Sequence, residues 1–199
     1  MNTKIKRTKF NVSLLGESTV GKTSMIQKYL GNSIKASSLA TIGIDNITDK
    51  VKFDGQDYIF KIYDTAGQEK YRSLTTSIIK VNEGFLLVFA VNNQNSYDRI
   101  NYWINELADK VTLADKVIYL VGNKIDEHEP ERVIDYKVAA KFAEDNDMKY
   151  FETSAKTGDG IKEVFKSLYE EVYNKNKSKI PTNVKLVQEP KKKGGGCCK

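Results

Sequence analysis

The sequence has few of the side chains that most often act as catalysts or bind metals in small enzymes. Its 199 residues include one histidine, His128, and two cysteines, the adjacent Cys197 and Cys198. A lone histidine with no cysteine or second histidine nearby does not build a zinc site, and it argues against histidine-based catalysis. Two neighbouring cysteines cannot cross-link a fold, so this pair needs another explanation.

Long hydrophobic segments are also missing. No run of eighteen apolar residues occurs, and Met1 to Phe10 lacks the apolar core of a signal peptide. We therefore expect a protein that is neither secreted nor membrane-spanning and that stays in the cytosol. Because 40% of the 199 residues are hydrophobic, the chain is long enough for one well-cored domain.

Charge is unevenly distributed along the chain. A net charge of +6 would ordinarily suggest a nucleic-acid partner. However, residues 175–199 contain eight lysines and one glutamate, a net charge of +7, which leaves residues 1–174 with −1. The basic character belongs to a tail and not to a folded surface, so no nucleic-acid partner is expected.

The sequence pattern predicts three segments: a short basic start at 1–8, a folded domain at 9–174, and a basic tail at 175–199. The domain reads as strand, loop, helix, β-hairpin and then alternating strands and helices, which is typical of a mostly parallel sheet covered on both faces. Asp54-Gly55 predicts the hairpin turn. Two continuous apolar runs are expected to be buried strands that flank the first strand, namely Gly84–Val91 and Val117–Val121.

Three helices are predicted from capping residues and from apolar side chains at helical spacing. Ser96 is expected to cap the first helix and Asp135 the second. The apolar stripes are Ile100, Trp103, Ile104 and Leu107 in the first, Val138, Ala139, Phe142 and Ala143 in the second, and Ile161, Phe165, Leu168 and Val172 in the last.

The stretch Gly16–Thr23 matches the pattern G-x-x-x-x-G-K-[ST] between an apolar run and a helix-compatible run. A strand, loop and helix N-terminus in this order aim backbone N–H groups and the helix dipole at one spot, where phosphate is the natural occupant. Gly16 and Gly21 permit backbone conformations closed to other residues, Lys22 can reach the β- and γ-phosphates, and Thr23 can ligate Mg²⁺. The other residues expected around the phosphates are Glu17, Ser18, Thr19, Val20 and Ser24.

A phosphate loop alone would also suit an ATPase or a kinase. The residues that recognise the base therefore decide which nucleotide is expected. Asn123-Lys124-Ile125-Asp126 follows a predicted buried strand. The carboxylate of Asp126 only accepts hydrogen bonds, so it matches the N1–H and amine of guanine and no edge of adenine. Asn123 can bridge the base and the phosphate loop, and the Lys124 stem can lie along the ring. The loop after the next strand, which contains Ser154, Ala155 and Lys156, is expected to complete the pocket. The Ala155 N–H is expected to meet the guanine O6.

A third motif, Asp64-Thr65-Ala66-Gly67-Gln68-Glu69, follows the strand Tyr58–Tyr63. Asp64 is suited to holding Mg²⁺ through water, and Gly67 can bring its N–H to the γ-phosphate because no side chain intervenes. Gln68 is the candidate that orients the attacking water, and Thr41 is the second hydroxyl ligand for the metal.

These motifs in this order resemble the Ras superfamily of small GTPases over essentially the whole folded region. The resemblance implies an α/β fold, the P-loop NTPase small G domain, with a six-stranded, mostly parallel sheet, one antiparallel edge strand and helices on both faces. It implies binding of GTP and GDP with Mg²⁺ at Thr23, Thr41 and Asp64. It also implies hydrolysis of GTP to GDP and phosphate that depends on Gln68 and Lys22, and a base contact from Ile34.

Within the superfamily the chain is similar to the Rab proteins, the GTPases of vesicle traffic. The likeness rests on Thr41–Asp45, Lys70–Leu74 and the paired cysteines, whereas Ras and Rho proteins carry a prenylated cysteine at the position of Gly196. An Arf protein would need glycine at Asn2, and Ran-like proteins have an acidic end. The resemblance implies geranylgeranyl groups on Cys197 and Cys198. It also implies peripheral attachment to the cytosolic face of an intracellular membrane, with a soluble cytosolic pool.

The resemblance further implies a monomer with slow hydrolysis, because the motifs contain no built-in arginine finger. A GTPase-activating protein is therefore expected, beside an exchange factor, effectors and an escort protein or GDP-dissociation inhibitor. Three positions that partners read in Rab proteins depart from the family pattern, namely Asn46, Tyr63 and Ile78. Two rival hypotheses are a GTP-binding scaffold that does not hydrolyse, against which Gln68, Thr41 and Asp64 argue, and a Ras-like signalling GTPase outside vesicle traffic.

Overall fold

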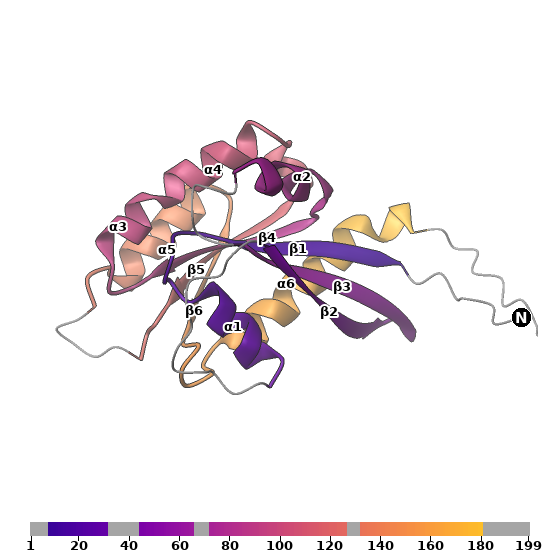
Figure 1. Cartoon of the computed structure of the whole chain (residues 1–199), viewed down its shortest axis with the longest axis horizontal. Helices are drawn as coiled ribbons and strands as arrows, with labels where there is room; N and C mark the ends of the chain where they lie inside the picture. The colour runs from indigo at the N-terminus through magenta and orange to yellow at the C-terminus, as the bar shows by residue number, and fades with distance from the viewer. Residues whose placement is uncertain (1–7, 32–43, 66–71, 127–131, 181–199) are drawn as a thin grey trace, which may run out of the picture.

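The structure is a computed structural model that describes residues 8–31, 44–65, 72–126 and 132–180 (Figure 1). The predicted site residues Ile34, Thr41, Gly67, Gln68, Cys197 and Cys198 lie outside these ranges. Their expected roles stay predictions.

The described residues form one six-stranded sheet in the order β2-β3-β1-β4-β5-β6. The strands are β1 (Lys9–Leu15), β2 (Ile44–Phe53), β3 (Gln56–Thr65), β4 (Gly84–Ala90), β5 (Val117–Asn123) and β6 (Lys149–Thr153). Only the edge strand β2 is antiparallel to its neighbour, and the other four pairings are parallel. The predicted α/β fold with a single antiparallel edge strand is confirmed.

The neighbours of β1 differ from the prediction. β4 does pair with β1, but β5 pairs with β4, and the other side of β1 is taken by β3. The predicted hairpin turn is present, since Asp54 and Gly55 have φ angles of 48° and 77°, both positive as in a tight two-residue turn. The turn reverses the chain, so β3 runs parallel to β1 and pairs with it from Lys9 to Leu14.

Helices cover both faces of the sheet (Figure 1). One face carries α1 (Lys22–Tyr29) and α6 (Ile161–Asn176), and the other carries α2 (Arg72–Val81), α3 (Gln94–Asp98), α4 (Ile100–Ala108) and α5 (Tyr136–Asp145). Short 3₁₀ turns lie at Leu113–Asp115 and Lys177–Lys179. Because side chains alternate along a strand, Leu14 joins the core under α1 and α6 while Leu15 joins the core under the other helices.

The predicted helix caps are half right. Asp135 caps α5, since its Oδ1 accepts a hydrogen bond from the Lys137 N–H at 2.8 Å. Ser96 does not cap its helix, because α3 begins two residues earlier and Asn93 accepts from the Ser96 N–H at 3.0 Å. Ser96 is instead buried, and its hydroxyl accepts from the Ala90 N–H at the end of β4.

The apolar stripes are confirmed except at one residue. The four predicted positions of α6 are fully buried, whereas Val138 of α5 is 54% exposed. Ala139 is buried and adjacent to Val138, and successive residues of a helix point about 100° apart, so only one of the two can face the core fully. Trp103 is partly buried and packs on the core under α2 to α5, as expected. Within the described ranges, no helix is long and apolar enough to cross a membrane.

Candidate functional site

The predicted site residues that the structure describes lie at the carboxyl edge of the sheet. Gly16 follows β1, Asp64 lies near the end of β3, Asn123 ends β5, and Ser154 follows β6. The strand order reverses at β1, since β3 and β2 lie to one side and β4 to β6 to the other. In open α/β sheets, ligands bind at the carboxyl ends of strands beside such a reversal.

The loop after β1 is shaped by backbone conformations that need glycine. Gly16 has φ of 146°, and a Cβ there would lie 2.1 Å from the Val88 carbonyl oxygen. Gly21 has φ of 100°, and its Cβ would lie 2.3 Å from Nδ2 of Asn123. Thr19 adopts φ of 65°, which is unusual for a β-branched residue and typical of strained functional loops.

Lys22 lies inside this loop and is only 6% exposed. Its ammonium group donates to the carbonyl oxygens of Gly16 at 2.8 Å and Glu17 at 2.7 Å. Burial lowers the pKa of Lys22 to about 8, although the nearby carboxylates of Asp64 and Glu17 act in the opposite direction. A phosphate group beside the ammonium would favour its charged form, so the loop fits a polyphosphate ligand.

Two of the three predicted Mg²⁺ ligands touch one another although they are 41 residues apart in the sequence. The Thr23 hydroxyl donates to Oδ2 of Asp64 at 2.6 Å, and Asp64 is 3% exposed. A hydroxyl and a carboxylate next to a phosphate loop are the oxygen donors that Mg²⁺ takes from proteins when phosphates supply the rest. The donor set therefore fits the metal.

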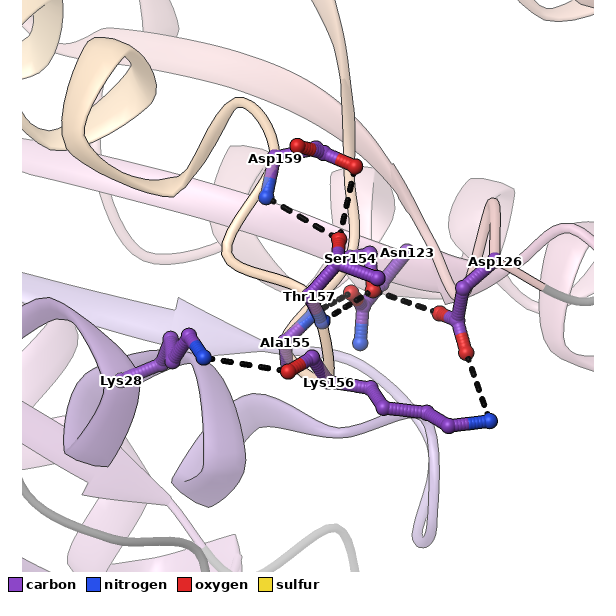
Figure 2. Close-up of polar contacts among 8 residues, drawn as sticks. All are labelled: Lys28, Asn123, Asp126, Ser154, Ala155, Lys156, Thr157 and Asp159. Carbon is purple, nitrogen blue, oxygen red and sulfur yellow. Dashed lines mark hydrogen bonds and ion pairs between the residues drawn. The ribbon is translucent and has the colours of Figure 1, made fainter.

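Asn123 joins the phosphate loop to the loop after β6, and Figure 2 shows its contact with Ala155. Its expected contact with the base stays a prediction. Its side-chain N–H donates to the Val20 carbonyl at 2.8 Å, and its Oδ1 accepts from the Ala155 N–H and the Thr153 hydroxyl, each at 3.1 Å. The Ala155 N–H, which the sequence analysis assigned to guanine O6, thus has Asn123 as its partner in the structure. Asn123 is 1% exposed, so these contacts are shielded from water.

Asp126 is oriented by the second base loop. Its Oδ1 accepts from the Ser154 hydroxyl at 2.6 Å, and its Oδ2 pairs with the Lys156 ammonium at 3.4 Å. Burial acts to raise the pKa of Asp126, but the hydrogen bond from Ser154 and the Lys156 charge outweigh it, and the pKa is lowered overall. The carboxylate is ionised at neutral pH and accepts hydrogen bonds only, as guanine recognition requires.

Two residues beside the site were not predicted. Arg99, between α3 and α4, donates from Nε to Oε1 of Glu17 at 3.4 Å across 82 residues of sequence. Lys28, in the last turn of α1, donates to the Lys156 carbonyl at 3.1 Å. No sequence pattern indicates a role for Arg99. Lys28 stands on the helix that begins at the phosphate loop, and that position could have marked it as a candidate site residue.

A glycine-shaped phosphate loop and a buried lysine at the carboxyl edge of a parallel sheet define a P-loop nucleotide-binding domain. The sequence profile of the Ras family matches residues 11–174. The chain is 36% identical over 165 residues to the Ras-related protein Rab-18-B of Danio rerio, covering 83% of this chain and 80% of the relative. It is also 36% identical over 165 residues to the Ras-related protein Rab-18 of Lymnaea stagnalis, covering 83% and 81%. The chain belongs to the Rab branch of the Ras family of small GTPases.

Membership of this family confirms the predicted enzyme class. Ras-family proteins bind GTP and GDP with Mg²⁺, hydrolyse GTP, and work with exchange factors, activating proteins and effectors. The protein is therefore a GTPase.

Proposed function

We propose that this GTPase is a switch of intracellular vesicle traffic that works while attached to the cytosolic face of a membrane. The observation that carries its nucleotide-binding role is the bridge made by buried Asn123, which joins the phosphate loop at Val20 to the base loop at Ala155. One side chain thereby aligns the two ends of a guanine nucleotide. The traffic role is inferred from the Rab names of the relatives and from the paired cysteines of the tail.

In this proposal each part of the site has one task. The phosphate loop and Lys22 neutralise the phosphates, while Thr23, Thr41 and Asp64 hold Mg²⁺, which supplies further charge neutralisation when bound. Gln68 orients the attacking water. Phosphoryl transfer asks for positioning and charge more than covalent chemistry, so turnover is slow until an activating protein contributes to the site.

The base pocket is tested by Asp126→Asn. We expect preference to move from guanine toward xanthine nucleotides, because the amide replaces one acceptor oxygen by an NH₂ donor and xanthine offers an acceptor where guanine has an amine. An unpaired buried polar edge costs about 1–3 kcal/mol, which is roughly a 5- to 150-fold loss of GDP affinity. Binding titrations with GDP and XDP measure this change. The control is Asp145→Asn, at an exposed residue that ends α5. Unchanged GDP affinity would remove Asp126 from the pocket.

The membrane attachment is tested at Cys197 and Cys198. A single lipid chain binds membranes only marginally, so two lipidated cysteines and the cluster Lys191–Lys193 would act together, each lysine adding about 1 kcal/mol near an anionic surface. We expect Cys197→Ser with Cys198→Ser to move the protein from the membrane fraction to the soluble fraction. Replacing the three lysines by glutamine should weaken attachment less. Unaltered fractionation of the cysteine variant would contradict lipidation.

The partners are expected to differ from those of Rab proteins that keep the family pattern at the positions of Asn46, Tyr63 and Ile78. Asn46 and Tyr63 lie directly opposite one another on β2 and β3, and Asn46 is exposed where the family usually presents an aromatic ring. This pair alters the surface that effectors read. The location of a tagged protein, compared with that of a Gln68→Leu variant, separates a traffic role from Ras-like signalling.

A further inference from the structure

Lys28 reaches from α1 to the loop 154–159, which follows β6. Its ammonium group donates to the Lys156 carbonyl oxygen at 3.1 Å, joining two residues that are 128 positions apart in the sequence. Figure 2 shows the side chain extending from the helix toward this carbonyl, on the side of the loop away from Asp126. The contact thus connects the helix that starts at the phosphate loop to the loop that supports the guanine-reading carboxylate.

The stem of Lys28 also packs against this loop. Gly158 has φ of 103°, and a Cβ on it would lie 2.8 Å from Cε of Lys28 and 3.7 Å from Nζ. The bare backbone of Gly158 therefore makes room for the lysine stem. A second observation, independent of the hydrogen bond, places Lys28 on the loop.

The loop under Lys28 is closed by hydrogen bonds that transmit its position to Asp126. Ser154 donates its N–H to the Asp159 carbonyl at 3.0 Å, and its own carbonyl accepts from the Gly158 N–H at 2.8 Å. The Ser154 hydroxyl accepts from the Thr157 N–H at 3.0 Å and donates to Asp126 at 2.6 Å. A displacement of Lys156 or Gly158 therefore moves Ser154, which orients the carboxylate.

We propose that Lys28 is a positioning residue of the base pocket and that it slows GDP release by holding the loop 154–159 against α1. The inference rests on the proposed assignment of Asp126 and the Ser154 loop to guanine. Lys28 does not contact the base in this account. It acts on the loop from outside, by a route separate from the Asn123 bridge.

The experiment measures dissociation of fluorescent GDP from matched variants of the full chain. Lys28→Met keeps most of the stem and removes the donor, and we expect release to be about two- to tenfold faster, the range for loss of one hydrogen bond. Lys28→Arg keeps a donor and should stay within about twofold of the natural protein. Lys162→Met, at an exposed lysine in the first turn of α6, is the control and should change nothing.

A double-mutant cycle with Gly158→Ala identifies the route of the effect. At a φ of 103° the new Cβ should both strain the backbone and displace the lysine, so Gly158→Ala should speed release in the natural background. Lys28→Ala should then speed release less in the Gly158→Ala background than in the natural one. Removing Mg²⁺ should speed release by the same factor in the natural protein and in Lys28→Met, because the phosphate side is unchanged. A general loosening of the domain would not preserve that factor.

The experiments distinguish failure of the proposed role of Lys28 from failure of the proposed guanine site. Equal GDP release from the natural protein and Lys28→Met would overturn the inference, leaving Lys28 as a solvated charge at the end of α1. Full additivity in the cycle would overturn it as well. If Asp126→Asn fails to change nucleotide preference, the assignment of the pocket falls first, whatever the Lys28 variants do.

Discussion

The position of Tyr29 decides whether its ring could replace the aromatic base contact that Ile34 lacks. It ends α1, five residues before Ile34, so it is an alternative source of an aromatic ring for the base. In the structure its ring stacks on Phe165 at 4.3 Å and meets the edge of Tyr169 at 6.0 Å. Its hydroxyl donates to Asp49 at 2.7 Å. The ring is part of the packing between α1 and α6 and is not available to stack on a base.

This packing sharpens a prediction for Ile34, which lies twelve residues after Lys22, where small GTPases of this family usually carry an aromatic ring against guanine. An aliphatic side chain lacks the flat quadrupolar surface that is worth about 0.5–1.5 kcal/mol, roughly a factor of two to ten in affinity. We expect faster GDP release than is usual for the family, and a several-fold slower release from Ile34→Phe. Fluorescent GDP dissociation measures both.

The matched control is Val81→Phe, at an exposed aliphatic residue that ends α2. It adds a ring away from the proposed pocket and should leave GDP release unchanged. Identical rates for the natural protein and Ile34→Phe would show that position 34 does not face the base.

Site residues were predictable from the sequence where their geometry is set locally. Gly16 and Gly21 were expected to adopt backbone conformations closed to other residues, and their positive φ angles confirm this. Phosphate binding by the loop stays a prediction. Thr23 and Asp64 were each expected to hold Mg²⁺, and the structure adds the direct hydrogen bond between them. The contact of Arg99 depends on how distant elements pack, and nothing near it in the sequence indicates it. Lys28 stands on the helix that begins at the phosphate loop, which points to the site, but its partner is set by the packing of α1 against the loop after β6.

At the scale of elements, the β2–β3 hairpin is fastened to the end of α6. Asp54, in the turn, accepts from the Lys177 ammonium at 2.5 Å and from the Tyr173 hydroxyl at 2.9 Å. The Tyr173 ring also stacks on Phe53 with centroids 4.7 Å apart. The tight turn therefore serves as the acceptor that holds the last turn of the helix.

Asp54→Asn should lower the melting temperature at neutral pH and have little effect in acid. Hydrogen bonds from Lys177 and Tyr173 lower the pKa of Asp54 in the folded state. A carboxyl whose folded pKa is lowered contributes stability above its unfolded pKa, and that contribution is lost as the pH falls through the folded value. The difference between the natural protein and Asp54→Asn should thus be present at pH 7 and decline as the pH falls through the lowered folded pKa of Asp54.

Thermal unfolding followed by circular dichroism across this pH range measures the effect, and asparagine keeps the turn because it tolerates positive φ. Asp109→Asn, at an exposed position after α4, is the control. A difference that persists undiminished at acid pH would show that the turn, and not the charge, is responsible.

Elements were easier to predict than their arrangement. The α6 stripe and the buried strands follow from side-chain period, which each segment carries by itself. The pairing of β5 with β4 instead of β1 is a property of the whole sheet, and nothing within Val117–Val121 specifies its neighbour. The cap of α3 shifted from Ser96 to Asn93 because two good capping residues stand three positions apart and the end of β4 selects between them.

For the whole molecule, bound nucleotide should be a major source of stability. A ligand that binds only the folded state at 100 times its dissociation constant adds about 2.7 kcal/mol. For a domain of this size that corresponds to roughly 5–10 °C in melting temperature. Removing Mg²⁺ with EDTA and then the nucleotide should lower the melting temperature by this order, as differential scanning fluorimetry measures. Adding back GDP with Mg²⁺ should restore it, whereas ATP should not, and equal rescue by ATP would contradict guanine selection.

Helix α6 runs from the proposed nucleotide edge of the sheet to the opposite edge. It starts at Ile161, just after the base loop, and runs 16 residues to Asn176, about 24 Å at 1.5 Å per residue. Its end lies at the opposite edge of the sheet, beside the hairpin turn, and the tail continues from there. A lipid anchor in that tail would therefore hold the domain by its far end. The nucleotide edge would face the cytosol, where regulators can approach without touching the bilayer.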